Sequence, residues 1–269
     1  MTEAGPILLV GCGKMGAALL RGWLGRGVSP DAVRVVEPMP AALDGLAVWH
    51  CAEAGGLPAD FVPRIVVLAV KPQVMAAVLP AYRRLARPGT TFLSIAAGRT
   101  IASMAAALGA DAAIVRSIPN TPAAVGRGIT VACASPAVDA AGRALCDQLL
   151  AAVGEVAWVE DEGLIDPVTA VSGNGPAYVF LLMECMAEAG RSVGLPAELA
   201  MQLARATVSG AGELARQSPE PAAQLRRNVT SPGGTTEAAL GVLMAADGIQ
   251  PVFNRALAAA VRRARELAG

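Results

Sequence analysis

The sequence predicts an α/β protein, with a doubly wound, mostly parallel sheet in the first part of the chain and an all-helical region in the second. In the first part, short continuous apolar runs alternate with helical spacers, which is typical of strands covered by helices on both faces. Beyond about residue 160 no strand-like run is found, and stretches rich in Ala, Leu and Met take over. We therefore expect two domains, residues 1–159 and residues 160–269.

Each expected strand is an apolar run with few interruptions. The sheet is predicted from residues 7–10, 33–36, 64–70, 91–95, 113–116, 129–134 and 156–159. Because proline lacks a backbone N–H and interrupts helices, Pro176, Pro196 and the pair Pro219 and Pro221 divide the helical region. The helices are predicted over residues 165–171, 177–193, 197–216, 235–246 and 253–267.

Composition excludes several classes of protein. The chain has 269 residues, and its 22 Lys and Arg balance 22 Asp and Glu, so it lacks the basic surplus of a nucleic-acid binder. Apolar residues make up 54% of the chain, yet the uncharged stretch between Asp166 and Glu184 is too interrupted by Gly and Pro for a membrane helix. The N-terminal residues do not resemble a signal peptide. We expect a cytoplasmic protein whose apolar excess lies in an oligomer interface.

Cysteine and histidine usage argues against metal, disulfide and triad chemistry. The chain has five cysteines, an odd number with no C-x-x-C pair, and we expect them to be small buried residues. A metal site needs several His or Cys ligands, and a Ser-His-Asp triad would depend on His50 alone. We therefore expect no metal.

The first apolar run leads into a G-x-G-x-x-G motif, and a helical pattern follows it. Glycines at these spacings permit a tight turn and close approach of the backbone to a pyrophosphate, which then lies at the N-terminus of a helix. An ordinary strand-to-helix turn is the alternative. The motif predicts a dinucleotide site that includes Gly11, Cys12, Gly13, Lys14, Met15 and Gly16.

Glu37 lies at the end of the second expected strand, 21 residues beyond Gly16. An acid in this place accepts hydrogen bonds from the adenosine ribose of NAD and would repel a 2′-phosphate. No arginine follows it, because the next residues are Pro38-Met39-Pro40, and the direction of Arg34 within the strand is left open. The expected cofactor is NADH or NADPH, with Glu37 favouring NADH; a solvated charge at a strand end is the alternative interpretation.

Four further motifs follow one another at spacings typical of one enzyme family: AVKPQ at residues 69–73, PNTPA at 119–123, SGNGPAY at 172–178 and VTSPGGTT at 229–236. With these motifs the chain resembles the pyrroline-5-carboxylate reductase family over essentially its whole length. The resemblance implies a Rossmann domain followed by a helical dimerisation domain, with dimers that often assemble further. It also implies hydride transfer from NAD(P)H to the C=N bond of 1-pyrroline-5-carboxylate, which gives L-proline.

The resemblance also implies roles for residues in these motifs. Residues of the cofactor cleft would be Ala69, Val70, Lys71, Pro72, Ala96 and Ala97. Asn120 would lie near the nicotinamide end. The loop that holds the substrate carboxylate would comprise Ser231, Gly233, Gly234, Thr235 and Thr236. The hydroxyl of Thr236 would lie at the ring nitrogen, as the catalytic contact.

Three positions depart from the family pattern. Asn174 replaces the usual serine of S-G-S-G-P-A-Y, and Glu37-Pro38 replaces a small polar residue followed by arginine. Gly56 stands where an asparagine is often found, by an ungapped count. The second departure puts the family's common use of NADPH in doubt for this chain.

The residues alone support the same chemistry. Reduction of a small cyclic imine needs a hydride donor, which the cofactor supplies, so the protein needs no nucleophile. The turn at residues 232–236 opens a helix, and its N–H groups and hydroxyls could hold a carboxylate; a plain capping turn with Glu237 in the first turn is the alternative. Lys71 is an alternative proton donor.

Two other functions are compatible with a dinucleotide domain. One is a different two-domain imine or β-hydroxyacid reductase, although the chain has no lysine after Lys71 to serve as the catalytic lysine of a hydroxyacid enzyme. The other is a nicotinamide-binding regulatory protein, in which we would expect the loop at residues 231–236 to be lost.

Overall fold

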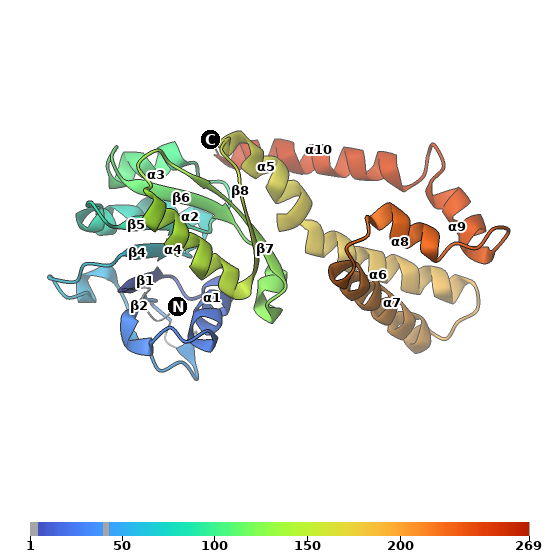
Figure 1. Ribbon diagram of the computed structural model, residues 1–269, viewed down its shortest axis with the longest axis horizontal. Coiled ribbons are helices and arrows are strands. Elements are labelled where there is room, and N and C mark those ends of the chain that lie inside the picture. The colour runs from blue at the N-terminus through green and yellow to red at the C-terminus, as the bar shows by residue number, and fades with distance from the viewer. Residues whose placement is uncertain (1–4, 40–42, 269) are drawn as a thin grey trace. The chain divides into compact units, whose positions relative to one another are not determined.

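The computed structural model describes residues 5–39 and 43–268 (Figure 1). Pro40 and the first residues of the chain, which entered the sequence analysis, lie outside this described part. The chain divides into two compact units. The first comprises residues 1–173 together with 260–269, and the second comprises residues 174–259. Each unit is described by itself.

The first unit contains an eight-stranded sheet in the order β3-β2-β1-β4-β5-β6-β7-β8. Its strands are β1 (Ile7–Val10), β2 (Val33–Val36), β3 (Trp49–Cys51), β4 (Ile65–Leu68), β5 (Thr91–Ser94), β6 (Ala113–Ile118), β7 (Gly128–Ala134) and β8 (Gly154–Trp158). All neighbouring strands are parallel except β6 and β7. The strand order reverses at β1, which pairs with both β2 and β4, and a ligand crevice forms at such a switch point beyond the carboxyl ends of the strands.

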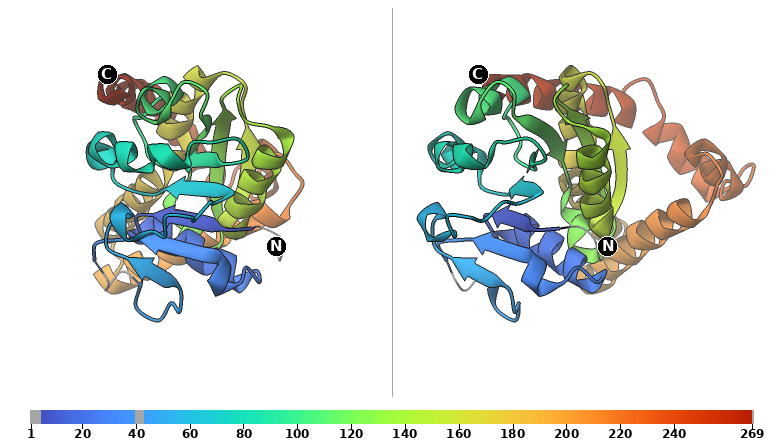
Figure 2. Two further views of the ribbon diagram at one scale, coloured as in Figure 1. Left: turned by 90° about the vertical axis from the view of Figure 1, so that its left-hand side faces the viewer. Right: turned by 60° about the vertical axis from the view of Figure 1, so that its left-hand side comes forward.

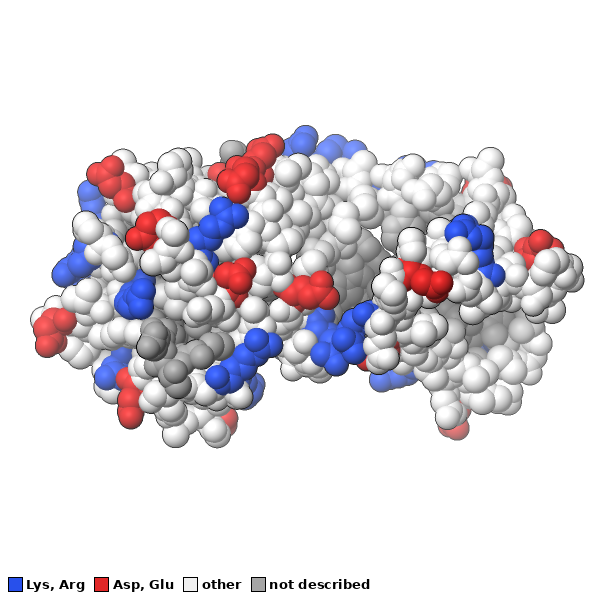
Figure 3. Space-filling model, in the orientation of Figure 1, with Lys and Arg blue, Asp and Glu red and all other residues white. Residues whose placement is uncertain are grey.

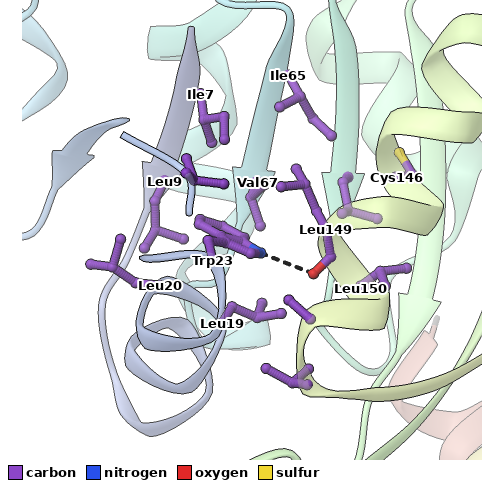
Figure 4. Packing of buried hydrophobic residues seen from close by; sticks show 14 of the residues in the cluster. Ile7, Leu9, Leu19, Leu20, Trp23, Ile65, Val67, Cys146, Leu149 and Leu150 are labelled. Carbon is purple, nitrogen blue, oxygen red and sulfur yellow. Dashed lines mark hydrogen bonds between the residues drawn. The ribbon is translucent and has the colours of Figure 1, made fainter. Parts of the chain in front are cut away.

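Helices cover both faces of this sheet (Figure 2). Alternate residues of β1 explain why: Ile7 and Leu9 pack with α1 (Lys14–Gly25) and α4 (Ala140–Leu150), whereas Leu8 and Val10 pack with α2 (Pro72–Val78) and α3 (Ile101–Leu108). Figure 4 shows the first of these layers, in which the indole N–H of Trp23 donates a 2.9 Å hydrogen bond to the carbonyl of Leu149. A strand buried on both faces has no polar face, so its sequence is continuously apolar.

The chain after β8 stays attached to the first unit through a buried ion-pair cluster. Arg116 on β6 is 2% exposed and lies 2.9 Å from Glu162 and 3.1 Å from Asp166. Glu162 also accepts a 2.8 Å hydrogen bond from the N–H of Ile101. Residues 160–173 therefore belong to the first compact unit. They include α5 (Ile165–Val168) and the π-helical turn Thr169–Gly173.

The second unit is helical. It contains α6 (Gly175–Ser192), α7 (Ala197–Gln217), α8 (Ala222–Asn228) and α9 (Thr235–Leu243), and α10 (Ile249–Ala268) begins in it and ends in the first unit. Its buried hydrophobic residues are small: Ala187, Ala200 and Ala204 pack together between α6 and α7. Larger apolar residues of this unit are exposed, among them Phe180, Leu181, Leu182, Leu203, Leu214 and Val242. A single copy therefore leaves much of its apolar surface in water.

Charged side chains of both signs occur on both units. On the face shown in Figure 3, acidic and basic side chains are interspersed over each of them. Within the described residues, no helix is both long enough and apolar enough to cross a membrane.

The predicted fold class is confirmed. No strand follows Trp158 in the described part of the chain, as expected for a helical second region. Among the strands and the helices of the second region, β3, which has three residues, and α8, a short helix that begins after Pro221, were not predicted. The segment predicted as one helix over 165–171 is a short α-helix followed by a π-helical turn.

Candidate functional site

The glycines of the first loop have distinct steric roles. Gly11 has φ +88°, and a Cβ there would lie 2.8 Å from the carbonyl oxygen of Ala69. A Cβ on Gly16 would lie 2.5 Å from the carbonyl oxygen of Gly11. A Cβ on Gly13, in contrast, would meet nothing within 4 Å. Gly11 and Gly16 are therefore required by the turn itself, whereas the space beside Gly13 is open to a ligand.

Gly13 is also the N-cap of α1, which begins at Lys14. No side chain caps this helix end, and its first turn contains no acidic residue. The first N–H groups of a helix have no partner within the helix and carry its positive dipole end. The loop therefore presents the groups that hold a phosphate.

A cavity of about 440 Å³ opens beside this loop. Six of the predicted cofactor residues line it: Gly11, Gly13, Glu37, Ala69, Val70 and Lys71. The other predicted cofactor residues do not line it: Cys12, Lys14, Met15, Gly16, Pro72, Ala96, Ala97 and Asn120. Cys12 and Ala96 are buried at 1% and 4% exposure, so they pack behind the cleft surface.

Several lining residues were missed by sequence reasoning. They include Met39, Ala52, Glu53, Ala54, Val74, Ala77, Val78, Ala81 and Tyr82. A signal existed for part of this set, because Val74, Ala77, Val78 and Ala81 follow the i, i+3, i+4, i+7 spacing of one helix face. This apolar wall suits the adenine of a dinucleotide.

Glu37 is buried at 6% exposure, and both of its carboxylate oxygens accept backbone hydrogen bonds. Oε2 accepts from the N–H of Cys12 at 2.6 Å, and Oε1 accepts from the N–H of Met39 at 3.0 Å. The side chain therefore joins the end of β2 to the glycine loop. It is not a solvated charge at a strand end.

The surroundings of Glu37 extend to β3. The N–H of Glu37 donates to the carbonyl of Cys51 at 3.0 Å, and its own carbonyl lies 2.7 Å from Nε2 of His50. A carbonyl can only accept, so Nε2 of His50 carries the proton. Burial, and secondly the Glu37 carboxylate, raise the pKa of the Cys12 thiol to about 11, so it stays protonated at neutral pH.

The direction of Arg34, which the sequence left open, is away from Glu37. Its guanidinium lies 5.4 Å from the ring centroid of Trp49 and donates a 2.9 Å hydrogen bond to the carbonyl of Asp31. Asp31 precedes β2, whereas Glu37 follows it. Arg34 is therefore turned toward the opposite end of the strand from the cofactor crevice.

Asn120 has two backbone partners. Its Oδ1 accepts from the N–H of Ile129 at 2.9 Å, and its Nδ2 donates to the carbonyl of Ser172 at 3.2 Å. It thereby ties the PNTPA loop to β7 and to the π-helical turn. A position near the nicotinamide stays a prediction for this residue.

The predicted substrate loop, residues 231–236, lies in the second unit at the start of α9. Gly233 has φ +69°, and Gly234 is the N-cap and donates a 3.0 Å hydrogen bond to the carbonyl of Ser231. The N–H of Gly233 donates to Oε2 of Glu237 at 2.7 Å. The alternative of a plain capping turn required a threonine cap and Glu237 in the first turn. Glu237 lies there, but no threonine side chain caps the helix. The N–H groups in the first turn of α9 remain available to an anion.

The comparisons with known proteins agree over the whole chain. Residues 162–267 match a family described as pyrroline-5-carboxylate reductase dimerisation, and residues 6–98 match one described as NADP oxidoreductase coenzyme F420-dependent. A pyrroline-5-carboxylate reductase from Pseudomonas aeruginosa is 42% identical over 264 residues, which cover 97% of this chain and 96% of that protein. The chain belongs to the pyrroline-5-carboxylate reductase family.

Solved structures lead to the same conclusion. A pyrroline-5-carboxylate reductase from Coxiella burnetii has a TM-score of 0.92 at 35% identity, covering 99% of this chain and 100% of that one. The Plasmodium falciparum enzyme, solved with NADP bound, has a TM-score of 0.84 at 27% identity and covers 100% of both chains. The family, the Rossmann-like fold with a helical dimerisation domain, and the oxidoreductase class are confirmed as predicted.

Proposed function

We propose that this reductase converts 1-pyrroline-5-carboxylate to L-proline with NADH as its preferred hydride donor. The reaction follows from the family, and NAD(P)H use agrees with the NADP-related family match and the NADP-bound relative. The observation that supports it best is the near full-length similarity to these reductases in a chain that keeps both the glycine loop and the SPGGTT loop.

The residues of the cleft fit a dinucleotide. The uncapped start of α1 and the open space at Gly13 suit the pyrophosphate. Each carboxylate oxygen has more than one lone pair, so Glu37 can accept from ribose hydroxyls while it holds Cys12 and Met39. When bound, the nicotinamide supplies the hydride, and the chain supplies binding and orientation.

The proposed preference for NADH rests on the two backbone N–H groups that the Glu37 carboxylate occupies. These are the N–H groups of Cys12 and Met39, which would otherwise be donors for an anion at this place. A 2′-phosphate would also meet the negative charge of Glu37, and Arg34 is turned away. NADH has no 2′-phosphate, so it needs no donor at this place and is not repelled by Glu37.

For the substrate, we assign the carboxylate to the start of α9. Since Glu237 takes the N–H of Gly233, the donors left for the carboxylate are the N–H groups of Thr235 and Thr236 with the nearby hydroxyls. The Thr236 hydroxyl would hydrogen-bond the ring nitrogen and orient the C=N bond. An imine is basic enough to arrive protonated, so a hydroxyl suffices and no strong acid is needed.

We further propose that residues 160–269 form the dimerisation and substrate-binding half. A helical unit whose buried hydrophobic residues are alanines, and whose Phe and Leu side chains are exposed, needs a second copy to cover them. Helices of two subunits would interleave, with the SPGGTT loop of the partner completing each site and with dimers assembling further. We also propose a cytoplasmic location, because the chain has an odd number of cysteines and no C-x-x-C pair.

A substrate panel tests the reaction. Purified protein is given NADH with 1-pyrroline-5-carboxylate, a β-hydroxyacid with NAD, or a thiazolidine carboxylate with NAD, and absorbance at the nicotinamide band is followed. We expect rapid turnover of the pyrroline carboxylate. Turnover of the hydroxyacid alone would favour the other reductase class, and cofactor binding without any turnover would favour a regulatory protein.

A further inference from the structure

The charged residues that line the 440 Å³ cofactor cavity are Glu37, Glu53 and Lys71. Glu37 and Lys71 are predicted cofactor residues, whereas Glu53 belongs to no sequence motif. Glu53 is two residues beyond the end of β3, and Glu37 is the residue that follows β2. Because β2 and β3 are paired neighbours, two carboxylates lie at adjacent strand ends on one side of the cavity.

Lys71 is placed at the other side. It follows β4, and the order β3-β2-β1-β4 puts two strands between its own strand and that of Glu53. Neighbouring strands lie about 4.8 Å apart, so the axes of β3 and β4 are separated by about 14 Å. Lys71 is therefore placed toward the pyrophosphate, at the strand next to the glycine loop, and not beside the two carboxylates.

The two carboxylates differ in their surroundings. Glu37 is buried and bonded to two backbone N–H groups. Glu53 is exposed, and its side chain makes no hydrogen bond or ion pair with the part of the chain that the structure describes. Only its backbone carbonyl is engaged, by the Cys51 thiol at 3.1 Å and by the N–H of Gly56 at 3.0 Å. No local bond therefore compensates the charge of Glu53.

We propose that Glu53 is a second specificity-determining residue, which acts with Glu37 to exclude the 2′-phosphate of NADPH. This inference rests on the proposed preference for NADH and names a further residue behind it. An acid at the end of β2 contacts the ribose 2′-hydroxyl, so a phosphate on that hydroxyl would stand beside the strand ends that carry Glu37 and Glu53. It would face two negative charges without a cationic partner on that side.

The test uses binding of adenosine 2′,5′-bisphosphate and of 5′-AMP, which differ only in the 2′-phosphate. Calorimetric titrations compare the wild-type chain with Glu53→Gln, and with Glu155→Gln as a control of equal charge change. Glu155 is an exposed residue of β8, at the opposite edge of the sheet from β3. We expect Glu53→Gln to tighten binding of the bisphosphate by about 3–10-fold and to leave 5′-AMP within about twofold, with the effect reduced in 0.5 M salt because charge repulsion is screened.

The outcomes separate this inference from the cofactor preference itself. If the ratio of the two affinities in Glu53→Gln stays within about twofold of wild type, or if Glu155→Gln changes it equally, the role of Glu53 is overturned. A second variant, Glu53→Ala, guards against an effect peculiar to glutamine and should change the ratio in the same direction. Wild-type protein that prefers NADPH would contradict the NADH proposal, whereas the ratio measured for Glu53→Gln would still decide the role of Glu53.

Discussion

The carboxylate of Glu37 accepts a 2.6 Å hydrogen bond from the backbone N–H of Cys12, across 25 residues of sequence. This bond joins the end of β2 to the glycine loop that leads into α1. One side chain thus stabilises the glycine turn and also places a negative charge beside it. With the cofactor preference proposed above, we expect cofactor choice and the stability of the loop to be coupled.

Glu37→Ser should improve the use of NADPH relative to NADH. The substitution removes the repelling charge and frees the N–H groups of Cys12 and Met39 for a phosphate. It should also cost about 1–3 kcal/mol of stability, because buried donors lose their acceptor. Steady-state kinetics with both cofactors and a thermal melt measure the two effects. A wild-type enzyme with a strong preference for NADPH would contradict this account.

Gly13→Ala and Gly11→Ala form a matched pair within the glycine loop. A Cβ on Gly13 meets no atom within 4 Å, so this variant should keep the wild-type melting temperature while its NADH binding weakens, because the methyl group obstructs the phosphate. A Cβ on Gly11 would lie 2.8 Å from the Ala69 carbonyl oxygen at φ +88°, so that variant should lose both stability and binding. Fluorescence titration with NADH measures binding, and a thermal melt measures the stability of each variant. Equal NADH affinity in Gly13→Ala and wild type would argue against pyrophosphate binding at this turn.

Thr236→Ala should lower turnover while NADH affinity stays nearly unchanged. If Thr236 acts as one preorganised donor at the imine nitrogen, its loss should reduce the rate by about 10- to 1,000-fold. NADH titration and single-turnover reduction distinguish binding from chemistry. A loss of NADH binding as large as the loss of rate would place Thr236 in the cofactor site instead.

Asp166→Asn should destabilise the first unit more than Glu160→Gln. Asp166 bonds Arg116, whose side chain is 3% exposed, whereas Glu160 pairs with Arg143 while its own side chain is 88% exposed. Loss of the charge on Asp166 should cost about 1.5–3 kcal/mol, since it weakens a buried bond to a charged group. Loss of the exposed pair should cost about 1 kcal/mol or less. Denaturant unfolding at one protein concentration measures both, and equal costs would show that the buried cluster adds no more stability than the exposed pair.

The sequence predicted the strands well where burial on both faces makes them continuously apolar. The runs at residues 7–10 and 33–36 coincide with β1 and β2. β3 was missed because it has three residues with polar His50 at its centre, so it has no apolar run. α8 was missed because it is short and contains few apolar residues, so it shows no amphipathic pattern.

The tight turn at Gly11 and Gly16 was predictable because the G-x-G-x-x-G spacing depends only on neighbouring residues. The binding of a phosphate at this turn stays a prediction. The amide partners of Glu37 and the two backbone partners of Asn120 depend on contacts between segments distant in sequence. Glu53 belongs to no motif, and only the adjacency of β2 and β3 brings it to the cavity.

The most direct test of the account follows the hydride itself. The purified protein is incubated with 1-pyrroline-5-carboxylate and NADH that carries two deuterium atoms at the nicotinamide C4, and the product is analysed by mass spectrometry. The account predicts L-proline with one deuterium at C5, the former C=N carbon, whichever face of the nicotinamide reacts. Absence of proline, or proline without deuterium, would contradict it.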